Sequence, residues 1–173
     1  GKMLLPASMG ADYRFSFPLQ VAPGRYSVRV SAADANGRVG STEQRVDAQL
    51  GRIGAFSVSG LLLGWSAGDD AQKLLALDTI PLEAATLRAS LELYADDAAG
   101  MASDIALRYS LVKVGDQTAV IEKELRPSAT GLVLFGSMDF DAKALAPGAY
   151  AIKVTVLQSG ADKGAVSILV RKK

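Results

Sequence analysis

The ten residues VAPGRYSVRV at positions 21–30 return in the same pattern as LAPGAYAIKV at positions 145–154. In both copies a proline fixes φ, a glycine permits a sharp bend, and a tyrosine opens a run in which apolar residues alternate with small or charged ones. Such alternation is typical of a half-buried β-strand. Each copy therefore predicts a corner that leads into a strand. The predicted structural corner residues are Pro23, Gly24, Tyr26, Pro147, Gly148 and Tyr150.

The two copies belong to a longer internal repeat. Residues 23–46 align without a gap on residues 147–170, at an offset of 124 positions (147 − 23), and Gly40 falls on Gly164. A repeat of domain length predicts two related modules in one chain. Residues 50–54, with two glycines and no clear periodicity, mark the expected boundary between them. We therefore divide the sequence into residues 1–52 and residues 53–173.

The second module is expected to be a complete β-sandwich. Residues 87–95 alternate strictly between apolar and polar types, and residues 53–173 contain about seven or eight such runs at sandwich-like spacing. Residues 119–125 carry three successive charges, which favours a sheet edge. After the second corner, alternate residues from Tyr150 should face inward, whereas Lys153 and Thr155 should face outward.

The first 50 residues contain about three expected strands, near residues 13–17, 26–32 and 38–48. They end in the same corner and hairpin as the second module, with turn chemistry in Asp34-Ala35-Asn36-Gly37. We interpret them as the C-terminal part of a first β-sandwich whose earlier strands are absent from this sequence. The predicted fold class is therefore all-β, an antiparallel sandwich with an additional N-terminal three-stranded β segment.

The corner pattern resembles a feature of known sandwiches. Leu/Val-x-Pro-Gly-x-Tyr before an alternating strand resembles the tyrosine corner of immunoglobulin-like and fibronectin type III domains, in which the tyrosine hydroxyl bonds back to the backbone. The resemblance implies an immunoglobulin-like fold and structural roles for Tyr26 and Tyr150.

A longer stretch carries a second resemblance. Residues 23–41 and then Leu-Leu-Leu-Gly at 61–64 are similar to the region that follows the von Willebrand factor type A-related domain of large exported bacterial proteins, notably from acidobacteria. This similarity covers roughly residues 20 to 65 and implies an extracytoplasmic accessory sandwich: periplasmic, cell-surface or secreted. The Asp-x-Ser-x-Ser metal motif of the von Willebrand type does not occur here, so metal-dependent adhesion is not carried over.

Composition excludes several function classes. The net charge is +1 with the signs interspersed, which argues against nucleic-acid binding. The apolar run at residues 61–65 is far shorter than the roughly 18 residues of a membrane span. With no cysteine and no histidine, the sequence excludes disulfides and thiol nucleophiles and argues strongly against zinc, copper and haem sites.

Two short motifs resemble catalytic sequences. Residues 64–68, Gly-Trp-Ser-Ala-Gly, match the nucleophile elbow with Ser66 as its nucleophile, but the chain lacks a histidine base and a strand-to-helix pattern. Ser110 and Lys113 match Ser-x-x-Lys, yet they lie in an alternating strand that would send them to opposite faces. We therefore predict that the protein is not an enzyme, with no catalytic, cofactor-binding or metal-binding residue and no cofactor.

Acidic loop pairs at Asp69-Asp70, Asp96-Asp97 and Asp139/Asp141 could offer oxygen ligands to Ca²⁺, although solvated carboxylates are the simpler interpretation. Trp65, the one tryptophan, is interpreted as a core or sheet-edge residue rather than a carbohydrate platform. The sequence thus predicts a non-catalytic structural or protein-interaction module of a larger exported bacterial protein. A carbohydrate- or Ca²⁺-binding accessory module is the alternative.

The expected partners are another protein or neighbouring domains of the same polypeptide. Three strands without their sheet partners would expose an apolar face. We expect residues 1–50 either to pack on the complete domain or to pair with a second copy in a homodimer.

Overall fold

The structure, a computed structural model, describes residues 21–68, 73–74, 78–101, 104–116 and 118–173. The chain divides into two compact units, Gly1–Gln49 and Leu50–Lys173. The strand expected at residues 13–17 lies outside the described residues. Residues 50–54, expected to be an irregular boundary, instead include a short strand, β3 (Gly51–Ile53), which pairs within the second unit.

The described part of the first unit is the predicted hairpin. Strands β1 (Arg25–Ala33) and β2 (Val39–Asp47) pair in antiparallel register. The turn between them is held by the Asp34 carboxylate, whose Oδ1 accepts from the backbone N–H groups of Asn36 and Arg38 at 2.9 Å each. This Asx-type turn is the one that the Asp-Ala-Asn-Gly sequence predicts.

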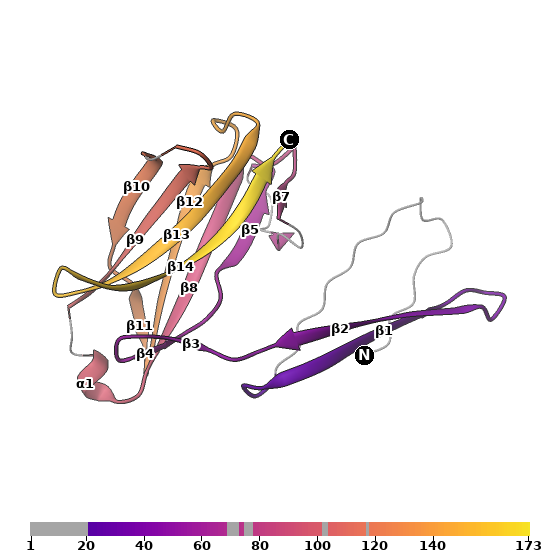
Figure 1. Ribbon diagram of the computed structural model, residues 1–173, viewed down its shortest axis with the longest axis horizontal. Helices are drawn as coiled ribbons and strands as arrows, with labels where there is room; N and C mark the ends of the chain where they lie inside the picture. Colours follow the sequence, from indigo (N-terminus) through magenta and orange to yellow (C-terminus); the bar gives the residue numbers. More distant parts are fainter. Residues whose placement is uncertain (1–20, 69–72, 75–77, 102–103, 117) are drawn as a thin grey trace. The chain divides into compact units, whose positions relative to one another are not determined.

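The second unit is an all-β sandwich of two facing sheets, which confirms the predicted fold class at this level (Figure 1). One sheet has the order β10-β9-β13-β14-β7, and its pairings are antiparallel except for the parallel pair β14–β7. Its strands are β7 (Thr79–Ile80), β9 (Ile105–Lys113), β10 (Ala119–Leu125), β13 (Gly148–Gln158) and β14 (Ala161–Lys172). The charged strand β10 lies at the end of this sheet, as predicted.

The facing sheet has the order β11-β12-β8-β4-β3, and β5 pairs with both β8 and β6. Its strands are β3, β4 (Phe56–Val58), β5 (Leu62–Ser66), β6 (Lys73–Leu74), β8 (Thr86–Ala95), β11 (Ser128–Thr130) and β12 (Val133–Asp141). Strands β4 and β5 pair with successive parts of β8. One side of β8 is therefore covered by two short strands instead of one long one.

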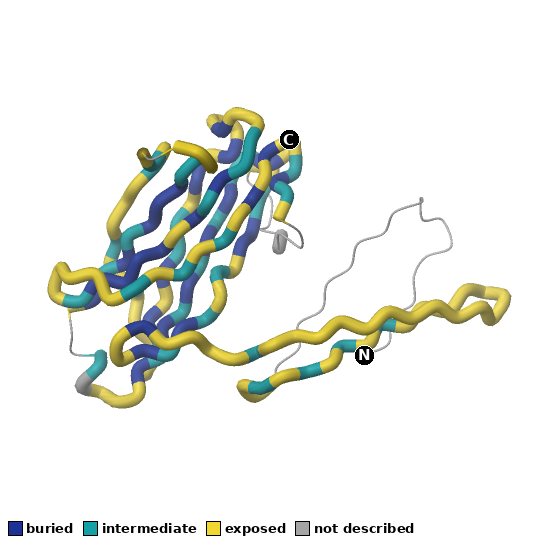
Figure 2. The backbone as a smooth tube through the Cα atoms, viewed as in Figure 1, coloured by how far each residue is buried: buried dark blue, intermediate teal, exposed yellow. Residues whose placement is uncertain are grey.

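The core lies between the two sheets and follows the sequence alternation. Every second residue of β8 from Leu87 to Ala95 is buried, and Tyr150, Ile152, Val154 and Val156 of β13 are each at most 2% exposed. Figure 2 shows these buried residues alternating with partly exposed ones along the strands of the sandwich. Burial of this apolar face supplies the main stabilisation of the unit.

The core also contains a close approach of two strands. A Cβ built on Gly136 of β12 would lie 2.4 Å from Leu107 Cδ1 and 3.1 Å from the hydroxyl oxygen of Tyr109, so any other residue would require the buried Leu107 side chain to shift. The Tyr109 side chain is fully buried, and its hydroxyl has no hydrogen-bond partner among the described residues. Burial raises the pKa of this hydroxyl because the interior disfavours the phenolate.

Three local features differ from the sequence predictions. The acidic pair Asp96-Asp97, expected in a loop, leads directly into a single helical turn, α1 (Ala98–Met101), which no sequence pattern predicted. Strand β11, with all three residues exposed, was not predicted because it has no apolar pattern. Thr155 was expected to face solvent but is 5% exposed. It lies in a central strand with Arg108 and Ala165 in register on either side, and such neighbours screen a short side chain.

Candidate functional site: the repeated corner hairpin and its outer edge

The two corners have the same hydrogen bond. The Tyr150 hydroxyl donates to the carbonyl oxygen of Ala146 at 2.7 Å, and the Tyr26 hydroxyl donates to that of Ala22 at 2.6 Å. Each acceptor lies four residues before its tyrosine. Gly148 has a φ of 149°, a conformation that favours glycine, and a Cβ there would lie 3.2 Å from Lys113 Cε.

The two hairpins also have the same strand register. Tyr26 pairs with Val46, as Tyr150 pairs with Val170, and the equivalence continues without a shift to Ala32–Gly40 and Val156–Gly164. Beyond that point β13 and β14 contain a bulge, whereas β1 and β2 continue in register. The sequence repeat is therefore a structural repeat, in which one building block occurs twice.

The two blocks differ in how their apolar faces are covered. In the sandwich, Tyr150, Ile152 and Val154 are at most 2% exposed. In the hairpin, the equivalent residues Tyr26, Val28 and Val30 are only half-buried. Figure 2 shows β1 and β2 as largely exposed strands.

The outer strands of the two blocks differ even more in chemistry. Residues 40–46 of β2 read GSTEQRV, whereas residues 164–170 of β14 read GAVSILV and carry no charge. We call residues 164–170 the β14 edge. Leu169 in this edge is 63% exposed, although its register equivalent in β2 is Arg45.

The β14 edge is open on its outer side over most of its length. Among the described residues, β14 pairs on that side only with β7, through Arg171 and Lys172. Before Arg171, the backbone groups of β14 that point outward have no strand partner in the described part of the chain. Strand β3 of the facing sheet contacts β14 across the core, where a Cβ on Gly164 would lie 3.2 Å from Ile53 Cγ2.

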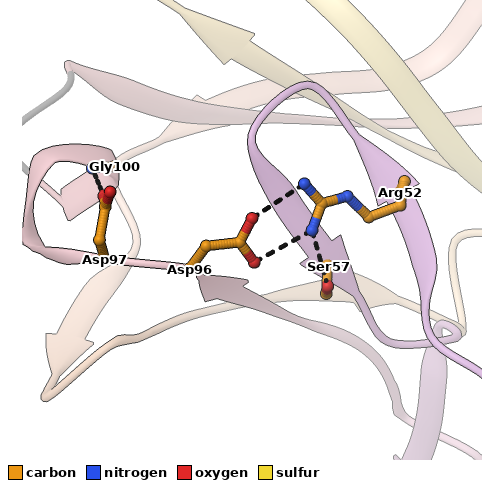
Figure 3. Close-up of polar contacts among 5 residues, drawn as sticks. All are labelled: Arg52, Ser57, Asp96, Asp97 and Gly100. Atoms are coloured by element: carbon orange, nitrogen blue, oxygen red, sulfur yellow. Dashed lines mark hydrogen bonds and ion pairs between the residues drawn. The ribbon is translucent and has the colours of Figure 1, made fainter.

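The acidic pair Asp96-Asp97 is used for structure. Both carboxylate oxygens of Asp96 are held by Arg52, with Nη1–Oδ1 at 3.0 Å and Nη2–Oδ2 at 2.9 Å, and Arg52 also donates to the hydroxyl of Ser57 (Figure 3). The hydrogen bond from Arg52 lowers the pKa of Asp96. Asp97 Oδ1 accepts from the backbone N–H of Gly100 at 3.0 Å, where it holds the start of α1. A guanidinium thus occupies the position that a cation would need at Asp96.

The carboxylates of Asp139 and Asp141 also accept hydrogen bonds within the protein. Asp139 receives two hydrogen bonds from Arg88, each of 2.6 Å, and Asp141 Oδ1 accepts from the backbone N–H groups of Lys143 and Ala144. Asp69 and Asp70 lie outside the described residues. Within the residues that the structure describes, no group of three or more acidic side chains is placed to hold a metal ion.

The serines of the two catalytic motifs lie in regular strands. Ser66 is the last residue of β5 and pairs with Thr86, and Ala67 and Gly68 follow outside the strand. Ser110 in β9 is 8% exposed, and its hydroxyl lies 3.5 Å from the carbonyl oxygen of Lys153, while Lys113 lies three positions further along the same strand. Trp65 is half-buried and packs against the core, as the sequence interpretation expected.

A shallow hollow of about 300 Å³ lies at one end of the sandwich, and no sequence motif indicated it. An ion pair between Arg126 and Asp104, at 3.0 Å, forms part of its wall. The hollow lies beside the end of strand β10, and Glu124 and Leu125 line it together with Ala106 and Gly160. Its residues come from three separate segments, which no local motif could connect.

Comparison of the chain with protein-family models and with curated proteins gives no match. In the described part of the chain, no helix has the length and apolar character that crossing a membrane requires.

Proposed function

We propose that this chain is a non-catalytic structural or protein-interaction module of a larger exported bacterial protein. In this proposal residues 50–173 form an immunoglobulin-like sandwich, and residues 1–49 are the C-terminal part of a preceding one. The observation that carries the proposal is the corner hairpin, which occurs twice with one register and one tyrosine hydrogen bond. Serial use of one building block is typical of extended proteins made of repeated domains.

The strand order supports the immunoglobulin-like assignment. Constant-type immunoglobulin domains place strands A, B, E and D in one sheet and C, F and G in the other. Here β4/β5, β8, β12 and β11 follow the first order, and β9, β13 and β14 follow the second. Tyr150 then lies near the start of strand F, where the tyrosine corner belongs, with its hydroxyl bonded back to Ala146. Tyr26 holds the equivalent position in the first unit.

The alternative is a carbohydrate- or Ca²⁺-binding accessory module. The engagement of Asp96 by Arg52, and of Asp139 by Arg88, weighs against calcium at these two positions because a bound guanidinium already neutralises each carboxylate. Packing of Trp65 against the core weighs against its use as a stacking platform. These contacts favour the structural or interaction role.

The proposed function is tested by calorimetric titration of the full chain with CaCl₂ and with a panel of soluble glycans. We expect no saturable heat and the same melting temperature in calcium and in a chelator. Saturable binding of either ligand would contradict the proposal and favour the alternative.

A hydrolase assay provides the matched test of the non-enzyme prediction. Ester hydrolysis by the purified chain should be the same for the parent and for Ser66→Ala. A stoichiometric, saturable activity that disappears on this substitution would overturn the proposal.

A further inference from the structure

We propose that the β14 edge is a docking site for an extended polypeptide segment of a partner protein, which adds to the sheet as an antiparallel strand. The partner segment has alternating apolar side chains and acidic residues near its ends. This inference deepens the proposed interaction role and rests on it.

The backbone geometry defines which groups are open. The N–H of Arg171 donates outward to the carbonyl of Asp78 at 2.6 Å, on the side of β14 away from β13. Because hydrogen-bonding direction alternates along an antiparallel strand, the N–H and C=O groups of Ser167 and Leu169 point to that same outer side. Those of Val166 and Ile168 point to β13. A polypeptide strand is the ligand that satisfies a row of such groups.

The side chains of the β14 edge support an apolar partner. Val166 and Ile168 face the core but are only partly buried. In the facing sheet, Trp65 of β5 and Leu61, which directly precedes β5, are likewise partly buried against the core. The contact between Gly164 and Ile53 shows that the β3 side of that sheet faces β14. The apolar side chains of an added strand, at every second position, would complete the burial of these partly exposed core residues.

The β1–β2 hairpin has a charged strand at the position that corresponds to β14. At the positions equivalent to Ser167 and Leu169, strand β2 has Glu43 and Arg45. Charged residues on an edge strand oppose the addition of further strands. The β14 edge lacks this protection: its seven residues carry no charge, and they include the strong β-formers Val166, Ile168 and Val170 and an exposed leucine.

The charges that flank the edge define the ends of the partner segment. Lys163 and Arg171 lie on either side of residues 164–170, and neither forms an ion pair within the described residues. Acidic side chains opposite or diagonal to them would be stabilising.

The same charges argue against a second copy of this chain as the occupant. A two-fold pairing centred on Ser167 would place Lys163 directly opposite Arg171 of the other copy, at both ends. Arg171 and Lys172 already pair with β7, so two copies would share only a short strand pair, a smaller contact than the roughly 1,200 Å² that stable complexes bury.

The probe is a labelled, end-blocked heptapeptide, Glu-Val-Thr-Val-Thr-Val-Glu, designed to lie opposite residues 163–169. In that register its valines face the core side, and its glutamates lie opposite Lys163 and diagonal to Arg171. We expect saturable binding to the full chain by fluorescence anisotropy. The same peptide with proline in place of its first threonine loses one inter-strand donor and should bind more weakly.

The decisive variant places charges on the β14 edge. Ser167→Glu combined with Leu169→Glu puts acidic side chains at two exposed positions, diagonal and opposite to the first glutamate of the peptide, so like charges oppose the added strand. Both positions are exposed, so the fold should be retained, as circular dichroism and the melting temperature can verify. We expect peptide binding to weaken by at least about tenfold. As the matched control, the charge exchange Glu43→Arg combined with Arg45→Glu keeps both charges in β2 and should leave peptide binding unchanged.

Three outcomes would overturn the inference: no saturable binding by the parent chain, equal binding by the folded β14 variant, or dimerisation of the parent that the β14 substitutions abolish. The last would make a second copy the occupant. Absence of peptide binding would contradict the docking site only. The proposed function is tested separately by the calcium, glycan and hydrolysis assays, which do not involve β14.

Discussion

The tyrosine hydrogen bond at the second corner should contribute measurably to the stability of the sandwich. Tyr150 is 2% exposed, and its hydroxyl is bonded to Ala146 at 2.7 Å. Tyr150→Phe removes this donor and leaves the Ala146 carbonyl without it, at a cost of about 1 to 2 kcal/mol. The unit Leu50–Lys173 has 124 residues (173 − 49), and about 2.1 cal/mol/K per residue gives an unfolding entropy near 0.26 kcal/mol/K. The melting temperature should therefore fall by about 4 to 8 °C.

Two further tyrosines provide matched controls for the same chemical change. Tyr109→Phe removes a buried hydroxyl that has no hydrogen-bond partner among the described residues, so stability should stay equal or rise. Tyr26→Phe changes the other unit and should leave the sandwich transition in place. Differential scanning calorimetry measures all three. A shift below about 2 °C for Tyr150→Phe, or an equal loss for Tyr109→Phe, would refute the corner hydrogen bond as a stabilising contact.

Three other predictions concern single residues of the sandwich. Gly136→Ala places a Cβ 2.4 Å from Leu107 Cδ1 and should destabilise the sandwich by about 1 to 3 kcal/mol in urea denaturation. Because the folded state raises the pKa of Tyr109, the unfolded chain loses this proton first, so stability should fall as pH rises above about 10, and Tyr109→Phe should remove this part of the loss. Arg52→Lys keeps the charge but loses the two-point contact with Asp96, so hydrogen exchange should accelerate in the β3–β4 hairpin while β13 is unaffected.

Periodicity in the sequence is sufficient to predict the long strands. Residues 87–95 alternate without an exception, and β8 buries every second one of them. The corner hairpins were also predictable because proline, glycine and turn residues specify backbone conformation locally. Both of these signals arise from neighbours along the chain.

Features that depend on distant residues were not predictable from one sequence. Strand β11 has three exposed residues and forms only because β12 is beside it. Arg52 and Asp96 are 44 positions apart, and no local pattern connects them. The β14 edge is open because β7 pairs only with Arg171 and Lys172, and the extent of that pairing is a property of the folded sheet. The uncharged run at residues 164–170 was visible in the sequence, but its meaning requires the register equivalence with β2.

Residue-resolved amide exchange of the full chain, with and without the heptapeptide, tests the proposed docking edge most directly. In the free chain the amides of Val166 and Ile168 should exchange slowly because they bond to β13, whereas those of Ser167 and Leu169 should exchange rapidly. Addition of the heptapeptide should slow exchange at Ser167 and Leu169 selectively. Unchanged exchange at these two amides under saturating peptide, or equal new protection along β2, would contradict the assignment of β14 as the interaction edge.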